Sequence, residues 1–265
     1  MQNSGLGNAV NPLVSLADSL GYRVPVLLLI GWRGEPGVKD EPQHARQGLI
    51  TLSLLETLGI EYSILPDTEE EACQAVAEAA SYMFRESKPY GLVVRKDLFA
   101  PYKSKEDFTG TDSNLYQMSR EEAAEIVLSA IEENAAVVST TGKLSREIYE
   151  YRDREGQGHG RDFLNVGSMG HASQIALGIA LQKPGCRLYC LDGDGAVLMH
   201  MGGLAIIGGS GALNYRHLIF NNGAHESVGG QPTAGFAVAF LKVGEACGYR
   251  KIMRAENKTE LRERM

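Results

Sequence analysis

Residues 190–200 read CLDGDGAVLMH, and residues 217–233 read HLIFNNGAHESVGGQPT. Each stretch begins with apolar residues and then becomes polar, at a Gly-Asp-Gly in the first case and at an Asn-Asn pair in the second. A short apolar run that ends in turn residues is typical of a buried strand. Ligands of open parallel sheets bind at the carboxyl ends of their strands. The two stretches therefore predict one ligand site on a parallel sheet.

The residue types at these strand ends favour a metal ion and a phosphate group. The carboxylate of Asp194 can hold a hard cation, and the amide oxygen of Asn222 can add a second ligand. Free backbone N–H groups near Gly195 and Ala196 can face a phosphate, and Gly193 lets a bulky anion approach the backbone. Gly, Asp and Asn are also the usual turn residues, so either group alone is consistent with an ordinary turn.

The composition of the chain limits its function class. The 265 residues are 43% hydrophobic and carry a formal net charge of −7, which is consistent with a globular protein. The acidic balance and the lack of a long Lys/Arg run argue against nucleic-acid and anionic-membrane binders and favour a small-molecule partner. No apolar run is long enough to cross a bilayer, and we expect a cytoplasmic protein whose four cysteines are reduced.

Strand and helix signals alternate along the chain, which predicts an α/β fold made of two parallel-sheet, three-layer domains. We expect a first domain at 1–99, a polar linker at 100–118 and a second domain at 119–265. Within the first domain, the apolar run 24–31 predicts a strand that is buried on both faces.

The remaining elements follow from periodicity and capping signals. Thr68 with Glu71, and Ser119 with Glu122, each predict a capping box at the start of a helix. Further strands are expected at 62–65, 90–96, 135–140, 186–193 and 215–222, and further helices at 47–58, from about 145, from about 171, after 195 and from about 235.

The Gly-Asp-Gly and Asn-Asn groups together resemble the diphosphate and metal signature of thiamine-diphosphate enzymes. The resemblance implies that Asp194, Asn222 and the backbone carbonyl of Ala224 bind Mg²⁺ beside thiamine diphosphate. The stretch NVGSMGHA at 165–172 fits the same family. There the resemblance implies that Met169 supports the bent cofactor and that the carbonyl of Gly167 accepts a hydrogen bond from its aminopyrimidine.

Four longer stretches narrow the resemblance to one branch of this family. Residues 3–18, 27–44, 139–150 and 220–233 are similar to phosphonopyruvate decarboxylases, with sulfopyruvate decarboxylases as the nearest alternative. This similarity implies that the protein is a carbon–carbon lyase of phosphonate biosynthesis, which converts 3-phosphonopyruvate to phosphonoacetaldehyde and CO₂ on thiamine diphosphate.

The anionic substrate requires cationic side chains and a proton donor. Arg33 and Lys39 are the expected substrate contacts, because they lie in a loop that follows a predicted strand. The candidate proton donors are His44, in the same loop region, and His225, which follows the implied metal ligand Ala224.

One departure from the family pattern concerns the start of the chain. The family's activating Glu lies on a strand upstream of the segment that corresponds to residues 3–8, and the chain begins at that segment. We therefore expect both domains to be truncated, the isolated chain to be a weak catalyst, and a homo-oligomer or a partner chain to complete the site. The alternatives are a paralogue or fragment that only binds the cofactor and, with less support, a dinucleotide-binding dehydrogenase.

Overall fold

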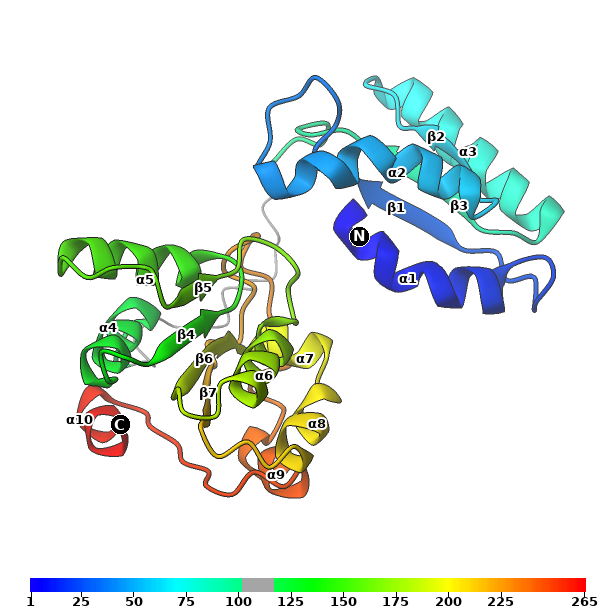
Figure 1. The fold of residues 1–265 in the computed structure, drawn as a ribbon. Coiled ribbons are helices and arrows are strands. Elements are labelled where there is room, and N and C mark those ends of the chain that lie inside the picture. Colours follow the sequence, from blue (N-terminus) through cyan, green and yellow to red (C-terminus); the bar gives the residue numbers. More distant parts are fainter. Residues whose placement is uncertain (102–116) are drawn as a thin grey trace. The chain divides into compact units, whose positions relative to one another are not determined.

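The computed structural model describes residues 1–101 and 117–265, so most of the predicted linker at 100–118 lies outside the described residues. The chain divides into two compact units, Met1–Lys103 and Ser104–Met265. Each unit is an α/β structure built on its own parallel sheet (Figure 1). This confirms the predicted fold class.

The first unit contains a three-stranded parallel sheet in the order β1-β3-β2. Its strands are β1 (Leu27–Gly31), β2 (Glu61–Ile64) and β3 (Tyr90–Val94). Its helices are α1 (Leu6–Pro12), α2 (Ala45–Thr57) and α3 (Glu69–Glu86), with short helical turns at Asn3–Gly5, Leu13–Ala17 and Pro42–His44.

Alternation along the central strand explains why this sheet is covered on both faces. Val93 of β3 packs with Leu6 of α1 and Leu55 of α2, whereas Leu92 packs with Ala79 of α3. Successive side chains of a strand point to opposite faces, so the two neighbouring residues belong to two separate apolar layers.

The prediction that residues 24–31 form a strand buried on both faces is wrong in two respects. The strand begins at Leu27, and Leu27 and Leu29 are 43% and 46% exposed, whereas Leu28 and Ile30 are buried. The reason is position, because β1 is the edge of the described sheet and the apolar layer under α3 contains no β1 residue. Apolar composition alone does not distinguish a central strand from an edge strand.

The second unit contains a four-stranded parallel sheet in the order β5-β4-β6-β7. Its strands are β4 (Ala136–Ser139), β5 (Asp162–Leu164), β6 (Leu188–Gly193) and β7 (Tyr215–Phe220). Its helices are α4 (Arg120–Ala130), α5 (Lys143–Arg154), α6 (Ala172–Gln182), α7 (Asp194–Met199), α8 (Gly203–Gly209), α9 (Phe240–Ala246) and α10 (Lys258–Arg264).

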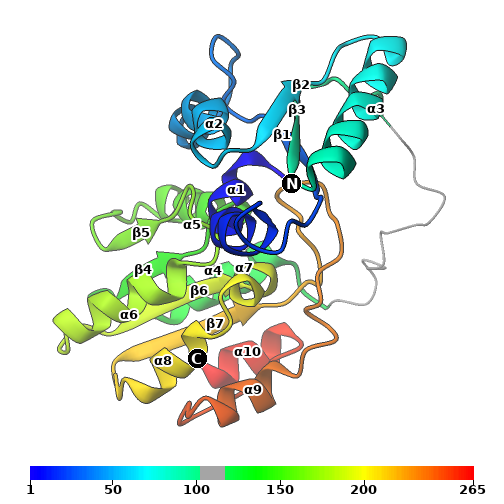
Figure 2. The same cartoon turned by 90° about the vertical axis from the view of Figure 1, so that its right-hand side faces the viewer.

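Helices cover both faces of this second sheet (Figure 2). Leu188 and Cys190 of β6 belong to an apolar cluster with α6, α8 and α9. Tyr189 and Leu191 of the same strand belong to a second cluster with α4, α5 and α10. The sheet is therefore the middle layer of three, and its polar atoms gather where the strands end.

The two predicted helix caps are present, and one of the two is a complete capping box. Ser119 and Glu122 form the reciprocal capping box at the start of α4. Thr68 accepts the predicted hydrogen bond from the N–H of Glu71, but the Glu71 carboxylate accepts from the Thr68 hydroxyl rather than from the backbone. Both helices start where the caps predict.

The helix expected from about Gly235 begins only at Phe240. The intervening segment folds back onto the end of β7, where the carbonyl of Gly235 accepts from the Asn221 amide. This tertiary contact replaces the first helical turn, and sequence periodicity does not reveal it. Strand β5 was not predicted, because three residues are too few for a periodic signal. The described helices include none that is long and apolar enough to cross a membrane.

Candidate functional site

The order of strands in the second unit places a change of direction between β4 and β6, and we call the region at the carboxyl ends of these two strands the crevice. From the central strand β4 the chain moves to β5 on one side, and later strands lie on the other side. Loops leaving β4 and β6 therefore diverge at their carboxyl ends, which is where α/β sheets bind ligands. A Cβ atom built on Gly193, at the end of β6, would lie 3.8 Å from the Thr140 methyl group that follows β4.

Buried hydrogen bonds fix the loops on the β4 side of this crevice. The Ser145 hydroxyl lies 2.7 Å from the carbonyl oxygen of Thr140 and 2.9 Å from that of Asn165. The Asn165 amide donates to the carbonyl of Ser139 at 2.9 Å. The Thr140 hydroxyl is buried and has no hydrogen-bond partner among residues 1–101 and 117–265. Because such groups are normally satisfied, this hydroxyl is suited to a bound ligand.

Asp194 lies at the centre of the crevice, where it is 2% exposed and begins α7. One of its carboxylate oxygens accepts a hydrogen bond from the Thr233 hydroxyl. A side chain at Gly235 would collide with this carboxylate and with the amide oxygen of Asn221. The three oxygen-bearing side chains of Asp194, Asn221 and Thr233 thus border one small space, which we call the oxygen cradle.

The second asparagine, Asn222, points elsewhere. Its amide oxygen accepts from the N–H of Ala224 at 3.2 Å, and its amide nitrogen donates to Glu226 at 3.2 Å. The structure therefore brings Asn221 to Asp194 and places Asn222 and Ala224 together in the loop beyond. Ligation by Asn222 and the Ala224 carbonyl stays a prediction.

His225 reaches the start of α7 across this loop. Its ring carbon Cε1 would lie 2.7 Å from a Cβ atom on Gly195, so only glycine allows this approach. The N–H of His225 donates to the carbonyl of Gln231 at 2.8 Å. The structure thus places this candidate proton donor beside Gly195, which the buried Ala196 follows in α7.

Gly167 and Met169 lie in the loop between β5 and α6. Met169 is partly buried, and its carbonyl oxygen lies 3.2 Å from Nδ1 of His171. The rings of His171 and His200 meet edge to face with centroids 4.5 Å apart. These contacts leave the cofactor roles of Gly167 and Met169 as predictions.

The candidates of the first unit occupy the loop after β1. Nε and Nη2 of Arg33 donate to Asp40 at 2.8 Å and 2.5 Å, so much of this guanidinium is already paired. Asn3 holds the same loop, because its side chain donates to the Arg33 carbonyl at 2.8 Å and accepts from the Arg33 N–H at 3.2 Å. Lys39 is exposed, and Nδ1 of His44 is buried with no partner among the described atoms.

The Arg33–Asp40 pair makes the stability of this loop pH-dependent. Hydrogen bonds from Arg33 hold the pKa of the Asp40 carboxyl well below its usual range, assisted by the N–H groups of Glu41 and Gly34. A depressed pKa stabilises the fold above the unfolded-state value of about 4, and this contribution is lost as pH falls through the folded-state value.

We expect Asp40→Asn to lower the free energy of unfolding by about 1.5–3 kcal/mol at pH 7, the range for hydrogen bonds to charged groups. The difference between variant and wild type should shrink below about pH 4, because Asp40 of the unfolded wild type then binds a proton that it must release on folding. Urea unfolding at pH 7 and pH 3 measures this. A difference of equal size at both pH values would contradict the assignment.

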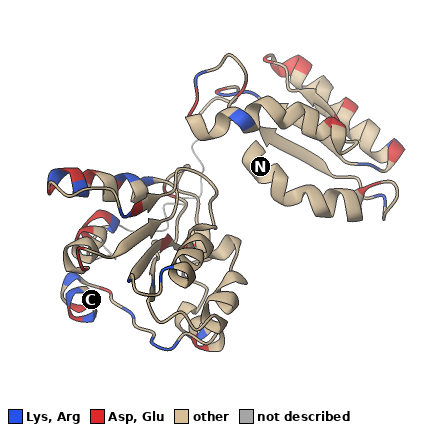
Figure 3. Ribbon diagram, viewed as in Figure 1, with Lys and Arg blue, Asp and Glu red and all other residues tan. Residues whose placement is uncertain are grey.

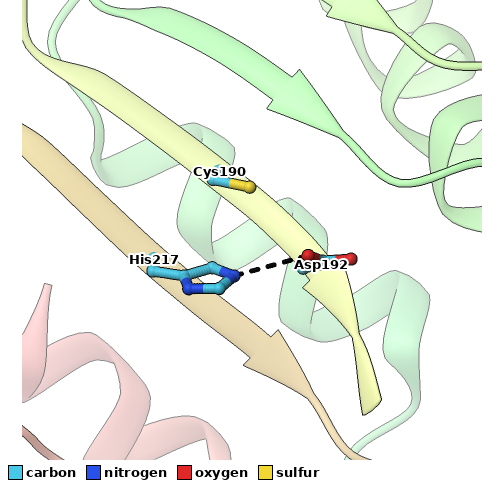
Figure 4. Close-up of side chains that lie close together, drawn as sticks. All are labelled: Cys190, Asp192 and His217. Atoms are coloured by element: carbon cyan, nitrogen blue, oxygen red, sulfur yellow. Dashed lines mark ion pairs between the residues drawn. The ribbon is translucent and has the colours of Figure 1, made fainter. Parts of the chain in front are cut away.

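A second polar cluster is buried inside the same unit as the crevice, and its Asp192 precedes Asp194 by two residues. Cys190 and Asp192 lie on one face of β6, and His217 lies beside them on β7 (Figure 4). Nε2 of His217 is 3.4 Å from a carboxylate oxygen of Asp192, and its Nδ1 is 3.1 Å from the Tyr249 hydroxyl. Burial raises the pKa of the Cys190 thiol, which favours its protonated form. The cluster joins β6, β7 and the segment after α9.

Sequence reasoning missed three residues of this region. Thr233 contacts Asp194, Thr140 presents a buried hydroxyl, and Glu226 contacts Asn222. Thr140 could have been found, because it directly follows an apolar run that predicts a strand. Thr233 and Glu226 carry no such signal, since the fold of a long loop decides where their side chains lie.

The parallel sheet, its crevice and the oxygen cradle define an α/β domain that binds an anionic cofactor together with a metal ion. Residues 140–265 match the family described as thiamine pyrophosphate enzyme, C-terminal TPP binding domain. The chain belongs to the thiamine pyrophosphate enzymes, within the branch that contains phosphonopyruvate and sulfopyruvate decarboxylases. Its cofactor is thiamine diphosphate, which is the same molecule as thiamine pyrophosphate. The standard metal partner of this cofactor is Mg²⁺.

Three relatives illustrate this membership. Phosphonopyruvate decarboxylase of Streptomyces viridochromogenes is 39% identical over 95% of this chain and 64% of its own length. Sulfopyruvate decarboxylase of Methanosarcina acetivorans is 28% identical over 97% of this chain and 68% of its own length. Sulfopyruvate decarboxylase subunit beta of Methanothermobacter thermautotrophicus is 34% identical over 53% of this chain and 72% of its own length. The chain thus spans somewhat less than two thirds of the first relative.

The residues at the crevice fit this cofactor. The oxygen cradle has the carboxylate, amide and hydroxyl donors that a hard cation prefers. The unpartnered Thr140 hydroxyl and the side-chain-free backbone at Gly193 suit a diphosphate, whereas the His225 ring covers the Gly195 position. A metal–diphosphate group therefore suits the chemistry of these residues.

Proposed function

We propose that the protein catalyses the decarboxylation of 3-phosphonopyruvate to phosphonoacetaldehyde and CO₂, with thiamine diphosphate and Mg²⁺ as cofactors. The observation that carries the proposal is the oxygen cradle around Asp194 at the crevice of the second sheet. The identity of 39% to a phosphonopyruvate decarboxylase, against 28% to a sulfopyruvate decarboxylase, supports the phosphonate substrate.

Within this proposal the second unit, expected at 119–265, holds the cofactor. Asp194, Asn222 and the Ala224 carbonyl bind Mg²⁺, and Asn221 supports them from the cradle. The diphosphate lies against the backbone of Gly193, Gly195 and Ala196. Gly167 and Met169, in the loop after β5, face the organic part of the cofactor. When bound, thiamine diphosphate supplies an electron sink for the breaking carbon–carbon bond.

The substrate residues in this proposal come from the loop after β1. Arg33 keeps one guanidinium nitrogen, Nη1, beyond those given to Asp40, and Lys39 offers an exposed ammonium group. Both can pair with the phosphonate and carboxylate charges. Loss of CO₂ leaves an electron pair on the former carbonyl carbon, and His44 or His225 adds the proton that completes the aldehyde.

Assembly and location complete the proposal. We propose at least a homodimer, or an assembly with a partner chain, because one relative carries the printed description "subunit beta". We further propose that residues 1–99 form the pyrimidine-type domain, that 100–118 link it to the second domain, and that the protein is cytoplasmic.

A direct assay separates the candidate functions. The full chain is incubated with thiamine diphosphate, Mg²⁺ and either 3-phosphonopyruvate or sulfopyruvate, while CO₂ and aldehyde are measured and cofactor binding is followed by calorimetry. Faster turnover of phosphonopyruvate supports the proposal, and faster turnover of sulfopyruvate replaces it with the alternative substrate. Cofactor binding without turnover of either substrate, with or without partner chains, identifies a protein that only binds the cofactor.

A further inference from the structure

The loop that follows β7, residues 222–230, is held by charged side chains from two helices. We call this segment the metal loop, because it contains Asn222 and Ala224. Its Glu226 carboxylate accepts from Nζ of Lys143 at 3.0 Å, at the start of α5, and from Nη1 of Arg120, at the start of α4. The Asn222 amide donates to the same carboxylate at 3.2 Å. One side chain thus joins the loop to both helices.

Arg120 is fixed before it reaches the loop. Its Nε and Nη2 donate to Glu147 of α5 at 2.8 Å and 2.5 Å, and the two side chains are only 17% and 16% exposed. The hydrogen bonds that Arg120 donates to Glu147 raise the pKa of Arg120, with the charges of Glu147 and Glu226 adding to the effect. A guanidinium held on one edge offers its remaining nitrogen in a defined direction. Figure 3 shows the charged residues of α4 and α5 in this part of the unit.

Ser227, the residue after Glu226, forms a further hydrogen bond with the start of α5. The N–H of Lys143 donates to the Ser227 hydroxyl at 3.1 Å. A Cβ atom on Gly142 would lie 2.5 Å from that hydroxyl, so glycine at this position allows the approach. Two consecutive loop residues, Glu226 and Ser227, are therefore attached to the start of α5.

These attachments lie immediately beside His225, whose ring contacts the Gly195 position. We infer that Glu226 is a positioning residue that latches the metal loop to α4 and α5 and thereby fixes the backbone of Asn222, Ala224 and His225 at the strand ends where we propose that the cofactor binds. The latch follows from the described hydrogen bonds alone, whereas its effect on cofactor affinity rests on the proposed function.

The chemistry of the carboxylate explains why charge is essential. Two cations and one amide donate to Glu226, which as a carboxylate can accept from all three. In Glu226→Gln an NH₂ group replaces one carboxylate oxygen. This group then faces the N–H donors of Arg120, Lys143 or Asn222, so at least one of the three hydrogen bonds is lost.

A matched control is available on the same pair of helices. Glu125 of α4 pairs with Arg154 of α5, so Glu125→Gln also removes an acidic partner of an arginine between α4 and α5. That pair has no contact with the metal loop among the described residues. Any effect specific to Glu226→Gln is then assigned to the loop rather than to the packing of the helices.

Two measurements on the full chain test the inference. Amide hydrogen exchange of the cofactor-free protein reports the latch, through the N–H groups of His225, Val228 and Gly230 that are hydrogen-bonded within the loop. Calorimetric titration with thiamine diphosphate and Mg²⁺ reports its effect on the site. We expect faster exchange in residues 223–230 and affinity reduced by about 10-fold for Glu226→Gln, comparable to the loss of a residue that orients metal ligands. Glu125→Gln should resemble the wild type in both.

The outcomes separate the latch from the proposed function. Exchange in residues 223–230 that is the same in Glu226→Gln and wild type overturns the latch, whatever the calorimetry gives. Faster exchange with unchanged cofactor affinity overturns its role at the site. Faster exchange in a protein whose wild type binds no thiamine diphosphate supports the latch and refutes the proposed function. Equal changes in Glu125→Gln would assign the effect to the helices and overturn the inference.

Discussion

Asp194→Asn is expected to lower the affinity for thiamine diphosphate with Mg²⁺ by roughly 100-fold or more, since even residues that only orient metal ligands cost about 10–100-fold when replaced. The substitution removes the one carboxylate of the oxygen cradle and keeps its shape. The Thr233 hydroxyl can still donate to the amide oxygen of the new side chain. We therefore expect the loss in binding and not in folding, and calorimetry measures it.

The control for this variant is an acidic residue outside the crevice. Asp153 on α5 has a 58% exposed side chain that contacts His159, and Asp153→Asn makes the same chemical change. It should leave the cofactor affinity unchanged. If Asp194→Asn bound the cofactor as tightly as Asp153→Asn while both kept the melting temperature of the wild type, Asp194 would not be a metal ligand.

Asp192→Ala is expected to lower the free energy of unfolding of the second unit by about 3 kcal/mol or more, the cost of leaving a buried polar partner uncompensated. Asp192 is fully buried, and its carboxylate contacts the His217 ring and accepts from the N–H of Gly193 at 3.0 Å. Nε2 of His217 has no hydrogen-bond partner among the described residues, so the variant removes the charge that faces this ring as well as the acceptor of the Gly193 N–H. Urea unfolding followed by circular dichroism measures the change.

A double-mutant cycle distinguishes this pair from a general packing defect. His217→Ala removes the other partner, and the double variant should be less destabilised than the sum of the two single variants, because neither group is then left uncompensated. The coupling should reach about 0.5–3 kcal/mol, the range for residues in contact. Strictly additive effects would show that the two side chains do not interact in the folded protein.

Several features could be predicted from the sequence because they depend on neighbours in the chain. The capping box of Ser119 and Glu122 involves residues three positions apart, so it marks the start of α4 directly. The apolar runs before Asp194 and Asn221 predict two strands, and parallel strands bring their carboxyl ends to one edge. The position of the candidate site and the α/β class follow from such local patterns.

The tertiary structure alone decided which side chains meet at that edge. The sequence favours Asn222 as the partner of Asp194, whereas the fold of residues 222–239 brings Asn221, Thr233 and Gly235 to it and turns Asn222 toward Glu226. It likewise decided that β1 is an edge strand with one exposed face. The physical reason is the same in both cases. Strand periodicity fixes the direction of a side chain relative to its own backbone. The residues that this side chain meets depend on strand order and on the path of long loops, and both are set by contacts between residues far apart in the sequence.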